Sequence, residues 1–261
     1  MIRISHWYGR LGNNIQQCAI AILVAQEIGG TFKQQLDHDI IENYETTFGS
    51  SSEEQVSKFF YWEGPYREVN LSSEFITQSI HKVCKKFIFP HLRVPRISIP
   101  DDTIVIHIRS GDVFDKGVTN PDQYVPNPLT YYMQLIQSFT STLVVTEDDE
   151  YNPVVEELKT YPFVTVQSLT VAEDFATMLS AKNLASSGVG TFAVAAALCS
   201  HNIENFYCTD VHITEHLNYH MLVDTDVKVH VLELPNYLKP GEWKNTDEQR
   251  ELLLSYKASV S

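Results

Sequence analysis

The second half of this chain alternates short apolar segments with segments of helical spacing, and this alternation restricts the fold more than any other feature. Apolar runs of strand length begin at Thr103 and recur as far as Tyr207. The expected strands are 103–109, 142–146, 163–166, 183–186 and 203–207, and the expected helices are 128–138, 153–160, 171–181 and 191–199. Single helices between strands produce a parallel sheet with right-handed crossovers, so this half is predicted to be α/β.

Helix-start signals support these boundaries. A polar cap residue, followed by a proline or by an acidic or amide residue three places later, precedes four expected helices: Asn127, Asn152, Thr170 and Thr246. The last of these begins a final predicted helix over 246–257, which can pack back on the first half of the chain.

The first half begins with a strand over 2–6, a glycine-containing loop over 7–12, and a helix capped by Asn13 that ends at Gly29-Gly30. Further helices are expected over 53–61 and 75–87. Prolines punctuate the region 90–102, which we interpret as a linker. The predicted domains are therefore an acceptor-side lobe over 1–100 and a nucleotide-sugar-binding lobe over 101–261.

Composition excludes several classes of protein. The 261 residues carry a net charge of −14, which disfavours nucleic acid as a partner. The chain contains neither the ~20 consecutive apolar residues of a membrane span nor a secretory leader, so we expect a cytoplasmic location. Cysteines are widely spaced and two lie in apolar runs, which predicts buried thiols rather than disulfides: Cys18, Cys84, Cys199 and Cys208. The oligomeric state is not defined.

Polar residues interrupt the apolar strand that begins at Thr103. His107 and Arg109 share one face at its carboxyl end, where open α/β sheets bind ligands. Burial of an unpaired guanidinium is costly, so an anion is expected there. The alternative is an internal ion pair between Arg109 and Asp112 that holds the following loop.

Two further features favour the same edge of the sheet. The segment Ser186–Thr191 combines glycines and hydroxyl groups before a helix, a pattern that suits a phosphate but also suits a plain glycine loop with a threonine cap. Glu173 and Asp174 lie in the first turn of the preceding helix. They either complement its dipole or bind a ring that donates hydrogen bonds, such as guanine.

Three of these motifs together resemble the fucosyltransferase superfamily, most closely its α1,2 type and more distantly the α1,6 and protein O-fucosyltransferases. The segment 9–19 is similar to the N-terminal G-x-[LF]-G-N-x-x-x-Q-x-A loop, and 107–112 to the H-x-R-R-G-D peptide. Gly190-Thr191-Phe192 resembles the S-x-[ST]-F segment, and Asp174 matches an acidic position that binds guanine in that family.

The resemblance implies a GT-B-like fold of two Rossmann-like lobes, the first one trimmed. It implies an inverting, metal-independent glycosyltransferase that uses GDP-fucose and no cofactor. Carried over by position, Arg109 would hold the β-phosphate, and His107 with Asp174 would bind guanine. Thr191, with Gly190 and Phe192 beside it, would hold the pyrophosphate. The opposite lip would be formed by Gly9, Gly12 and Asn13, and Arg10, a catalytic candidate, would lie near the donor or the acceptor.

The chain departs from the family pattern in several places. Ser110 stands where the second arginine is usual, and 193–197 is alanine-rich rather than aromatic. Asp115 is the candidate general base, with a solvated loop aspartate as the alternative. Two other function classes stay open: a GT-B transferase with a different nucleotide sugar, and a catalytically silent module that binds nucleotide or glycan.

Three other clusters of polar residues suggest different chemistry, and each has weaker support than the motifs above. Asp224-Thr225-Asp226 mimics the metal-binding D-x-D of other glycosyltransferases but follows the strand series. His212, His216 and His220 would line one helical face as a zinc site, or simply belong to a polar surface helix. The acidic run 147–150 ends a strand at the ligand edge. It is either a solvated loop or the equivalent of an acidic peptide in the family.

Overall fold

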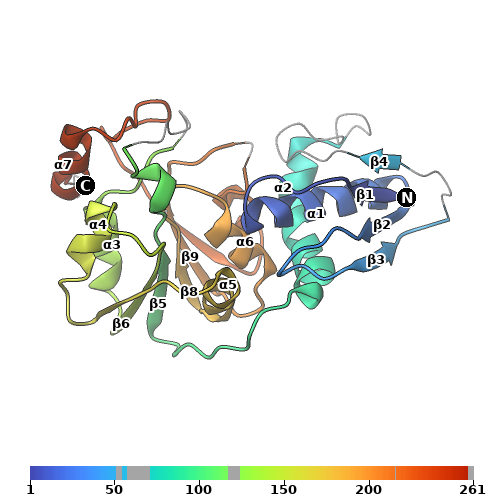
Figure 1. The fold of residues 1–261 in the computed structure, drawn as a ribbon, viewed down its shortest axis with the longest axis horizontal. Coiled ribbons are helices and arrows are strands. Elements are labelled where there is room, and N and C mark those ends of the chain that lie inside the picture. Colours follow the sequence, from blue (N-terminus) through green and yellow to red (C-terminus); the bar gives the residue numbers. More distant parts are fainter. Residues whose placement is uncertain (51–54, 58–70, 117–123, 215, 258–261) are drawn as a thin grey trace.

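The computed structural model describes residues 1–50, 55–57, 71–116, 124–214 and 216–257. Its larger sheet has six strands, all parallel, in the order β10-β9-β8-β5-β6-β7 (Figure 1). These strands are β5 (Thr103–His107), β6 (Ser141–Val145), β7 (Val164–Gln167), β8 (Asn183–Ala185), β9 (Asn205–Thr209) and β10 (Lys228–Leu232). Numbered along the chain, this is the 3-2-1-4-5-6 order of a Rossmann-like sheet, and it confirms the predicted α/β class.

Both faces of this sheet are covered by helices. Alternate residues of β5 belong to two different cores: Ile104 and Ile106 to one, and Val105 to the other. The first core is closed by α3 (Leu129–Ile136), α4 (Pro153–Leu158) and α7 (Asp247–Ser255), and the second by α5 (Val171–Ser180) and α6 (Phe192–Cys199). Burial on both sides explains why the strand reads as continuously apolar.

Most of the expected caps are present. The side chain of Asn152 accepts from Val154 N at 3.0 Å, and Thr170 with Glu173 forms a complete capping box. The prediction for Asn127 is wrong, because α3 begins one residue later without a side-chain cap. Asn127 is instead buried. Its amide donates to Ser186 O and accepts from Thr209 Oγ1, so it joins three strand-end loops.

The smaller sheet has the order β3-β2-β1-β4, with β3 antiparallel to β2 and the other pairs parallel. Its strands are β1 (Ile2–Ile4), β2 (Thr31–Gln34), β3 (Tyr44–Thr47) and β4 (Gln55–Ser57). The strands β2 and β3, which are four residues long and partly polar, were not expected from the sequence. The helix expected over 53–61 is wrong at Gln55–Ser57, and its other residues lie outside the described ranges.

A layer of helices lies between the two sheets (Figure 1). α1 (Leu11–Glu27) is buried along almost its whole length, because it packs on β1 and β2 and also contacts α6 and α2 (Ser73–Val83). The chain continues from α2 through a π-helical turn, Cys84–Ile88, and a 3-10 turn, Phe89–His91. Residues of α1, α2 and α6 belong to one core, so the two halves of the chain share their apolar interior.

The C-terminal region differs from expectation in two ways. The strand series continues beyond residue 207, because β10 pairs with β9 at the edge of the sheet. α7 contacts α3 and α4 rather than the first half of the chain. The apolar side chain of Leu253 explains this position, since it is fully buried in the core beneath α3 and α4.

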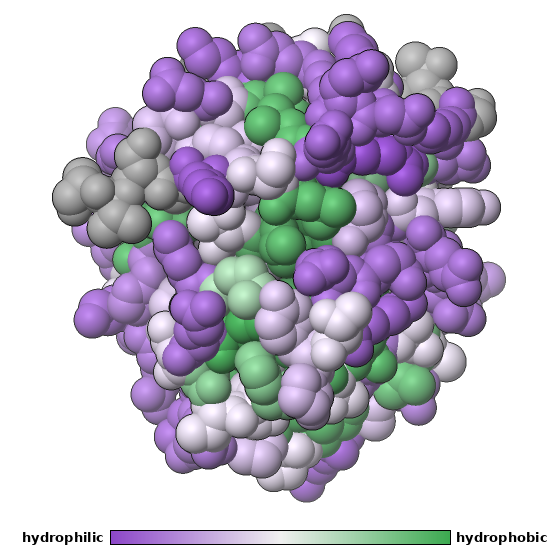
Figure 2. All heavy atoms as spheres, turned by 90° about the vertical axis from the view of Figure 1, so that its left-hand side faces the viewer, coloured by the Kyte–Doolittle hydropathy of each residue, from purple (hydrophilic) through white to green (hydrophobic). Residues whose placement is uncertain are grey.

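Figure 2 shows the face of the molecule that carries α3, α4 and α7, where hydrophobic residues reach the surface between hydrophilic ones. Leu254 of α7 is among the exposed large hydrophobic residues of the protein. Within the described ranges, none of the helices combines the length and apolar character needed to cross a membrane.

Candidate functional site

The strand order places a switch point between β5 and β8, at the centre of the larger sheet. The chain leaves β5 toward α3 on one face, and it leaves β8 toward α6 on the other face. The loops diverge there, and open α/β sheets bind their ligands in the crevice that such divergence creates. The loops at this switch point are 108–112 after β5 and 186–191 after β8.

Arg109 lies in the loop directly after β5. Its guanidinium donates to both carboxylate oxygens of Asp112, with Nη2–Oδ1 at 2.6 Å and Nη2–Oδ2 at 2.8 Å. The side chain is only 14% exposed and lies against Gly190, where an added Cβ would be 3.5 Å from Nη1. Burial lowers the pKa of Arg109, but the hydrogen bonds and charge of Asp112 outweigh this effect and raise it overall. The internal ion pair named above as the alternative is therefore present.

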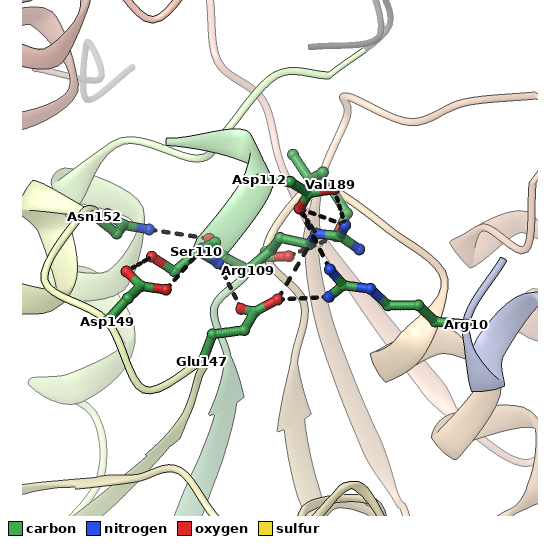
Figure 3. Close-up of polar contacts among 10 residues, drawn as sticks. Arg10, Arg109, Ser110, Asp112, Glu147, Asp149, Asn152 and Val189 are labelled. Atoms are coloured by element: carbon green, nitrogen blue, oxygen red, sulfur yellow. Dashed lines mark hydrogen bonds and ion pairs between the residues drawn. The ribbon is translucent and has the colours of Figure 1, made fainter. Parts of the chain in front are cut away.

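A second arginine reaches this cluster from the other half of the chain (Figure 3). Arg10 lies at the start of α1 and donates to Glu147 Oε1 at 2.9 Å, with Asp112 at 3.8 Å. Its side chain is 63% exposed, whereas that of Glu147 is 30% exposed. Glu147 Oε1 is also 4.0 Å from Arg109 Nε, so this carboxylate lies between the two guanidinium groups.

Two carboxylates from the acidic run after β6 bind the backbone of the loop after β5. Glu147 Oε2 accepts from Ser110 N at 2.7 Å. Asp149 accepts from Ser110 Oγ at 2.5 Å and from Gly111 N at 2.9 Å. Ser110 is fully buried by these contacts, so its side chain does not reach the crevice where a second arginine would point. The acidic run at this strand end is evident in the sequence. The backbone N–H groups that it binds could be identified only from the pairing of β5 with β6.

The N-termini of α1 and α6 meet at the same place. Thr191 Oγ1 donates to Asn13 Oδ1 at 2.8 Å, and a Cβ on Gly12 would lie 2.3 Å from Thr191 Oγ1. In the described part of the chain, neither helix has a side-chain cap or an acidic residue in its first turn. The helix α3 shares this absence, whereas α2, α4, α5 and α7 have both. The positive ends of these two dipoles are therefore left uncompensated beside Arg10 and Arg109.

Asn13 does not cap α1, contrary to expectation. The helix begins at Leu11, and the Asn13 side chain bridges to α6 instead. The glycines of both loops are required by the backbone and by close packing. Gly9 and Gly190 have positive φ of 65° and 84°, and a Cβ on Gly9 would collide with the Asn13 amide.

His107 is buried at the end of β5, and its ring makes an edge contact with Phe192, with the ring centroids 5.3 Å apart. Burial lowers the pKa of His107 to about 4, and the charges of Arg109 and Arg10 add to this effect against the opposing charge of Glu147. The imidazole is therefore neutral near pH 7, and it can exchange hydrogen bonds with a ligand but cannot serve as a cation.

Asp174 lies in the first turn of α5 and is also buried. It accepts from Gln167 Nε2 at 2.8 Å and from Leu169 N at 3.2 Å. Burial raises the pKa of Asp174, while these two hydrogen bonds lower it and leave a net upward shift. The ring centroid of Phe175, the next residue, is 5.3 Å from that of Phe192, whose ring also contacts His107.

Asp115 follows the 3-10 turn Gly111–Val113, and its backbone N–H donates to Gly111 O. The carboxylates that contact the two arginines are Asp112 and Glu147. The role of Asp115 as a base stays a prediction.

The two clusters that suggested a metal site lie in the C-terminal region of the chain. Asp226 pairs with Lys85 at 2.9 Å and lies 3.6 Å from His81, so it joins the C-terminal region to the end of α2. The helix expected to carry His212, His216 and His220 is wrong, because a 3-10 turn, Tyr219–Leu222, is the only helical part of that segment in the described residues. No group of three metal-ligating side chains occurs within the described ranges.

Comparison with known proteins found no matching family model, no matching curated protein and no matching solved structure. The site at the switch point holds two guanidinium groups, which pair with Asp112 and Glu147, two helix N-termini without side-chain caps, and a glycine loop. Such a set can stabilise a multiply charged anion such as a diphosphate.

Proposed function

We propose that this protein is a glycosyltransferase that binds a nucleoside-diphosphate sugar at the switch point of its larger sheet. One observation carries the proposal: Arg109 lies against Gly190 before α6, and Thr191 is bonded to Asn13 of α1, so a guanidinium and two helix N-termini without side-chain caps lie together at the switch point. A diphosphate leaving group carries negative charge at the point where these groups are positive. Fixed cations and dipoles at a developing charge are the main way in which enzymes stabilise such a transition state.

The motifs at 9–19, 107–112 and 190–192 support a more specific proposal, an inverting transfer of L-fucose from GDP-fucose by a GT-B-like enzyme. In this scheme Arg109 holds the β-phosphate, and Thr191 with the following N–H groups holds the pyrophosphate. His107 and Asp174 bind guanine. Neutral His107 suits this role, since a base edge requires hydrogen bonds rather than charge.

The bond from the sugar to the β-phosphate oxygen breaks as an acceptor hydroxyl attacks the opposite face of the sugar carbon. The bonding electrons leave with the diphosphate, and Arg109 and the α6 N-terminus stabilise them. The proton of the acceptor hydroxyl passes to a carboxylate, for which Asp115 is the candidate. Arg109 must exchange its contacts with Asp112 for contacts with the phosphate, so ligand binding competes with this ion pair.

Titration calorimetry with GDP, UDP, dTDP and ADP tests the proposal. We expect GDP to bind most tightly, and we expect Arg109→Ala to weaken that binding. Incubation with GDP-fucose and candidate acceptors should then release GDP. Failure of all four nucleotides to bind would reject the proposal, and preference for UDP or dTDP would indicate a transferase with a different donor.

A catalytically silent binding module is the second candidate. Two observations favour it: Asp112 already satisfies the Arg109 guanidinium, and Glu147 and Asp149 occupy the N–H groups of the following loop. Tight GDP binding without GDP release from GDP-fucose, over a broad panel of acceptors, would favour this candidate over the transferase.

A further inference from the structure

A cavity lies beside the glycine loop that follows β8. It has a volume of about 30 Å³ and is open to solvent. Its lining comes from three places: the glycine loop itself, α6 together with β9, and residues 211–213 and 216–219 after β9. The proposed function leaves this cavity without a role, although it is next to the loop that would hold the pyrophosphate.

The cavity is connected to Arg109 through Gly190. This glycine belongs to the cavity lining, and a Cβ added to it would be 3.5 Å from Arg109 Nη1. Gly188 also belongs to the lining, and a Cβ there would be 2.3 Å from Asn127 Oδ1, so no side chain from this position can fill the cavity without a shift. Arg109 and the cavity thus share one residue, and a group bonded to a phosphate at Arg109 is within reach of the cavity.

The lining segment after β9 is held in place by hydrogen bonds. Asn218 is buried, and its amide donates to His216 O at 3.0 Å and accepts from His220 N at 3.1 Å. Leu217 N donates to Gln16 Oε1 at 3.2 Å, which joins the segment to α1. The cavity is therefore preorganised, and the Asn218 amide, which also lines it, is used within the segment.

The lining is mostly apolar and the cavity is small. Val194, Phe206 and Leu217 are buried side chains of the lining, and Val211 with Ile213 adds half-buried ones. A volume of about 30 Å³ equals the share of one molecule in liquid water, which is also roughly the size of a methyl group. A nucleobase or a whole pyranose ring is several times too large. A hydroxymethyl group has one oxygen more, and burial of its hydroxyl against apolar side chains costs free energy.

We propose that this cavity receives the C6 methyl group of a 6-deoxy sugar and thereby selects that class of donor. The inference rests on the proposed transferase function, in which the sugar is bonded directly to the diphosphate at Arg109. Within a nucleoside-diphosphate sugar, such a methyl group is the part that is both apolar and small enough for the cavity. The cavity thus discriminates between a methyl and a hydroxymethyl group at C6.

Titration calorimetry of the full chain with GDP, GDP-L-fucose and GDP-L-galactose tests the inference. The two sugars have the same stereochemistry and differ only at C6, where fucose has a methyl and galactose a hydroxymethyl group. We expect GDP-L-fucose to bind roughly 10–100-fold more tightly than GDP-L-galactose. Equal affinities would overturn the inference. Tighter binding of GDP-L-galactose would also overturn it, because a polar side chain of the lining, such as His212, would then be a partner of the added hydroxyl.

Two substitutions of Val194 change the cavity in opposite directions. Val194→Ala enlarges it and should narrow the ratio of the two affinities several fold, because the hydroxymethyl group then fits. Val194→Ile fills it and should weaken binding of GDP-L-fucose while GDP binds as before. Val231→Ile is the matched control, since Val231 is exposed on β10 and lies outside the lining. If Val194→Ile does not fold, Val194→Ala still decides, and an unchanged ratio in that variant would contradict the assignment.

The titration with GDP alone separates this inference from the proposed function. If GDP binds and the two nucleotide sugars have equal affinities, the nucleotide site is retained and the role of the cavity is rejected. If none of the three ligands binds, the proposed function is rejected, and the inference is rejected with it.

Discussion

Thr191 Oγ1 donates a 2.8 Å hydrogen bond to Asn13 Oδ1, so the residue that begins α6 is bonded to the first turn of α1 across 178 positions of sequence. The two helix N-termini are thereby held at one point. Neither the hydroxyl nor the amide is used as a helix cap, so the backbone N–H groups of both first turns have no side-chain cap.

Replacement of Thr191 tests this bond. Thr191→Ala should lower the free energy of unfolding by about 1 kcal/mol, the usual net contribution of one hydrogen bond. Thr191→Ser keeps the hydroxyl and should retain most of the stability. Urea denaturation measures both variants, and equal losses for alanine and serine would show that the methyl group matters instead of the hydrogen bond.

Gly12→Ala should force α1 away from α6. The added Cβ would be 2.8 Å from the backbone carbon of Thr191, which cannot move as a side chain can. We expect a loss of roughly 1–3 kcal/mol in the free energy of unfolding, as for overpacked sites. Gly30→Ala is the control, since its closest new contact is the flexible side chain of Ile28 at 3.2 Å. A Gly12→Ala variant as stable as this control would contradict the close approach.

Arg109→Ala should lower kcat by roughly 10²–10³, the effect of removing one preorganised group from a developing negative charge. Arg109→Lys should recover part of this loss, since a point charge remains but the paired hydrogen bonds do not. Lys85→Ala removes a cation that pairs with Asp226 away from the crevice, and it should leave kcat unchanged. Full turnover by Arg109→Ala in a steady-state assay of GDP release would refute the assigned role.

Glu147→Gln should strengthen GDP binding by a few fold. The substitution removes a negative charge between the two arginines, and its amide oxygen can still accept from Ser110 N. Stability should change by less than ~1 kcal/mol, because the Arg10 partner is largely exposed. Calorimetry compares this variant with Glu156→Gln, which loses an exposed pair with Lys159 elsewhere. Weaker GDP binding in Glu147→Gln would mean that Glu147 orients the arginines rather than competing with the ligand.

The lowered pKa of His107 predicts a loss of stability in acid. The unfolded chain binds the His107 proton below about pH 6.5, whereas the folded chain resists it until about pH 4. The free energy of unfolding should therefore fall as the pH drops from 6.5 toward 4. His107→Asn cannot take up this proton and should show a shallower decline in urea denaturation across that range. His81, whose pKa burial also lowers to about 4, contributes equally to both proteins.

The larger sheet was predictable because its strands are buried on both faces. Continuous apolar runs such as Ile104–Ile106 stand out from any helical pattern, and caps such as Asn152 act within three residues of their helix. The strands β2 and β3 were not predictable in this way. They are short, and every second side chain faces solvent, so pairing with a neighbour rather than composition makes them strands.

The sequence by itself determined the α/β class, the edge of the sheet that carries Arg109, and the glycine positions of both loops, because each depends on residues that are close together in the chain. Only the tertiary structure decided what Arg109 contacts, that Asn13 and Asn127 bridge distant loops instead of capping helices, and that Glu147 and Asp149 hold the loop after β5. The reason is physical. A polar side chain binds whichever partner folding brings within hydrogen-bond distance, and for these residues that partner lies on another element of the fold.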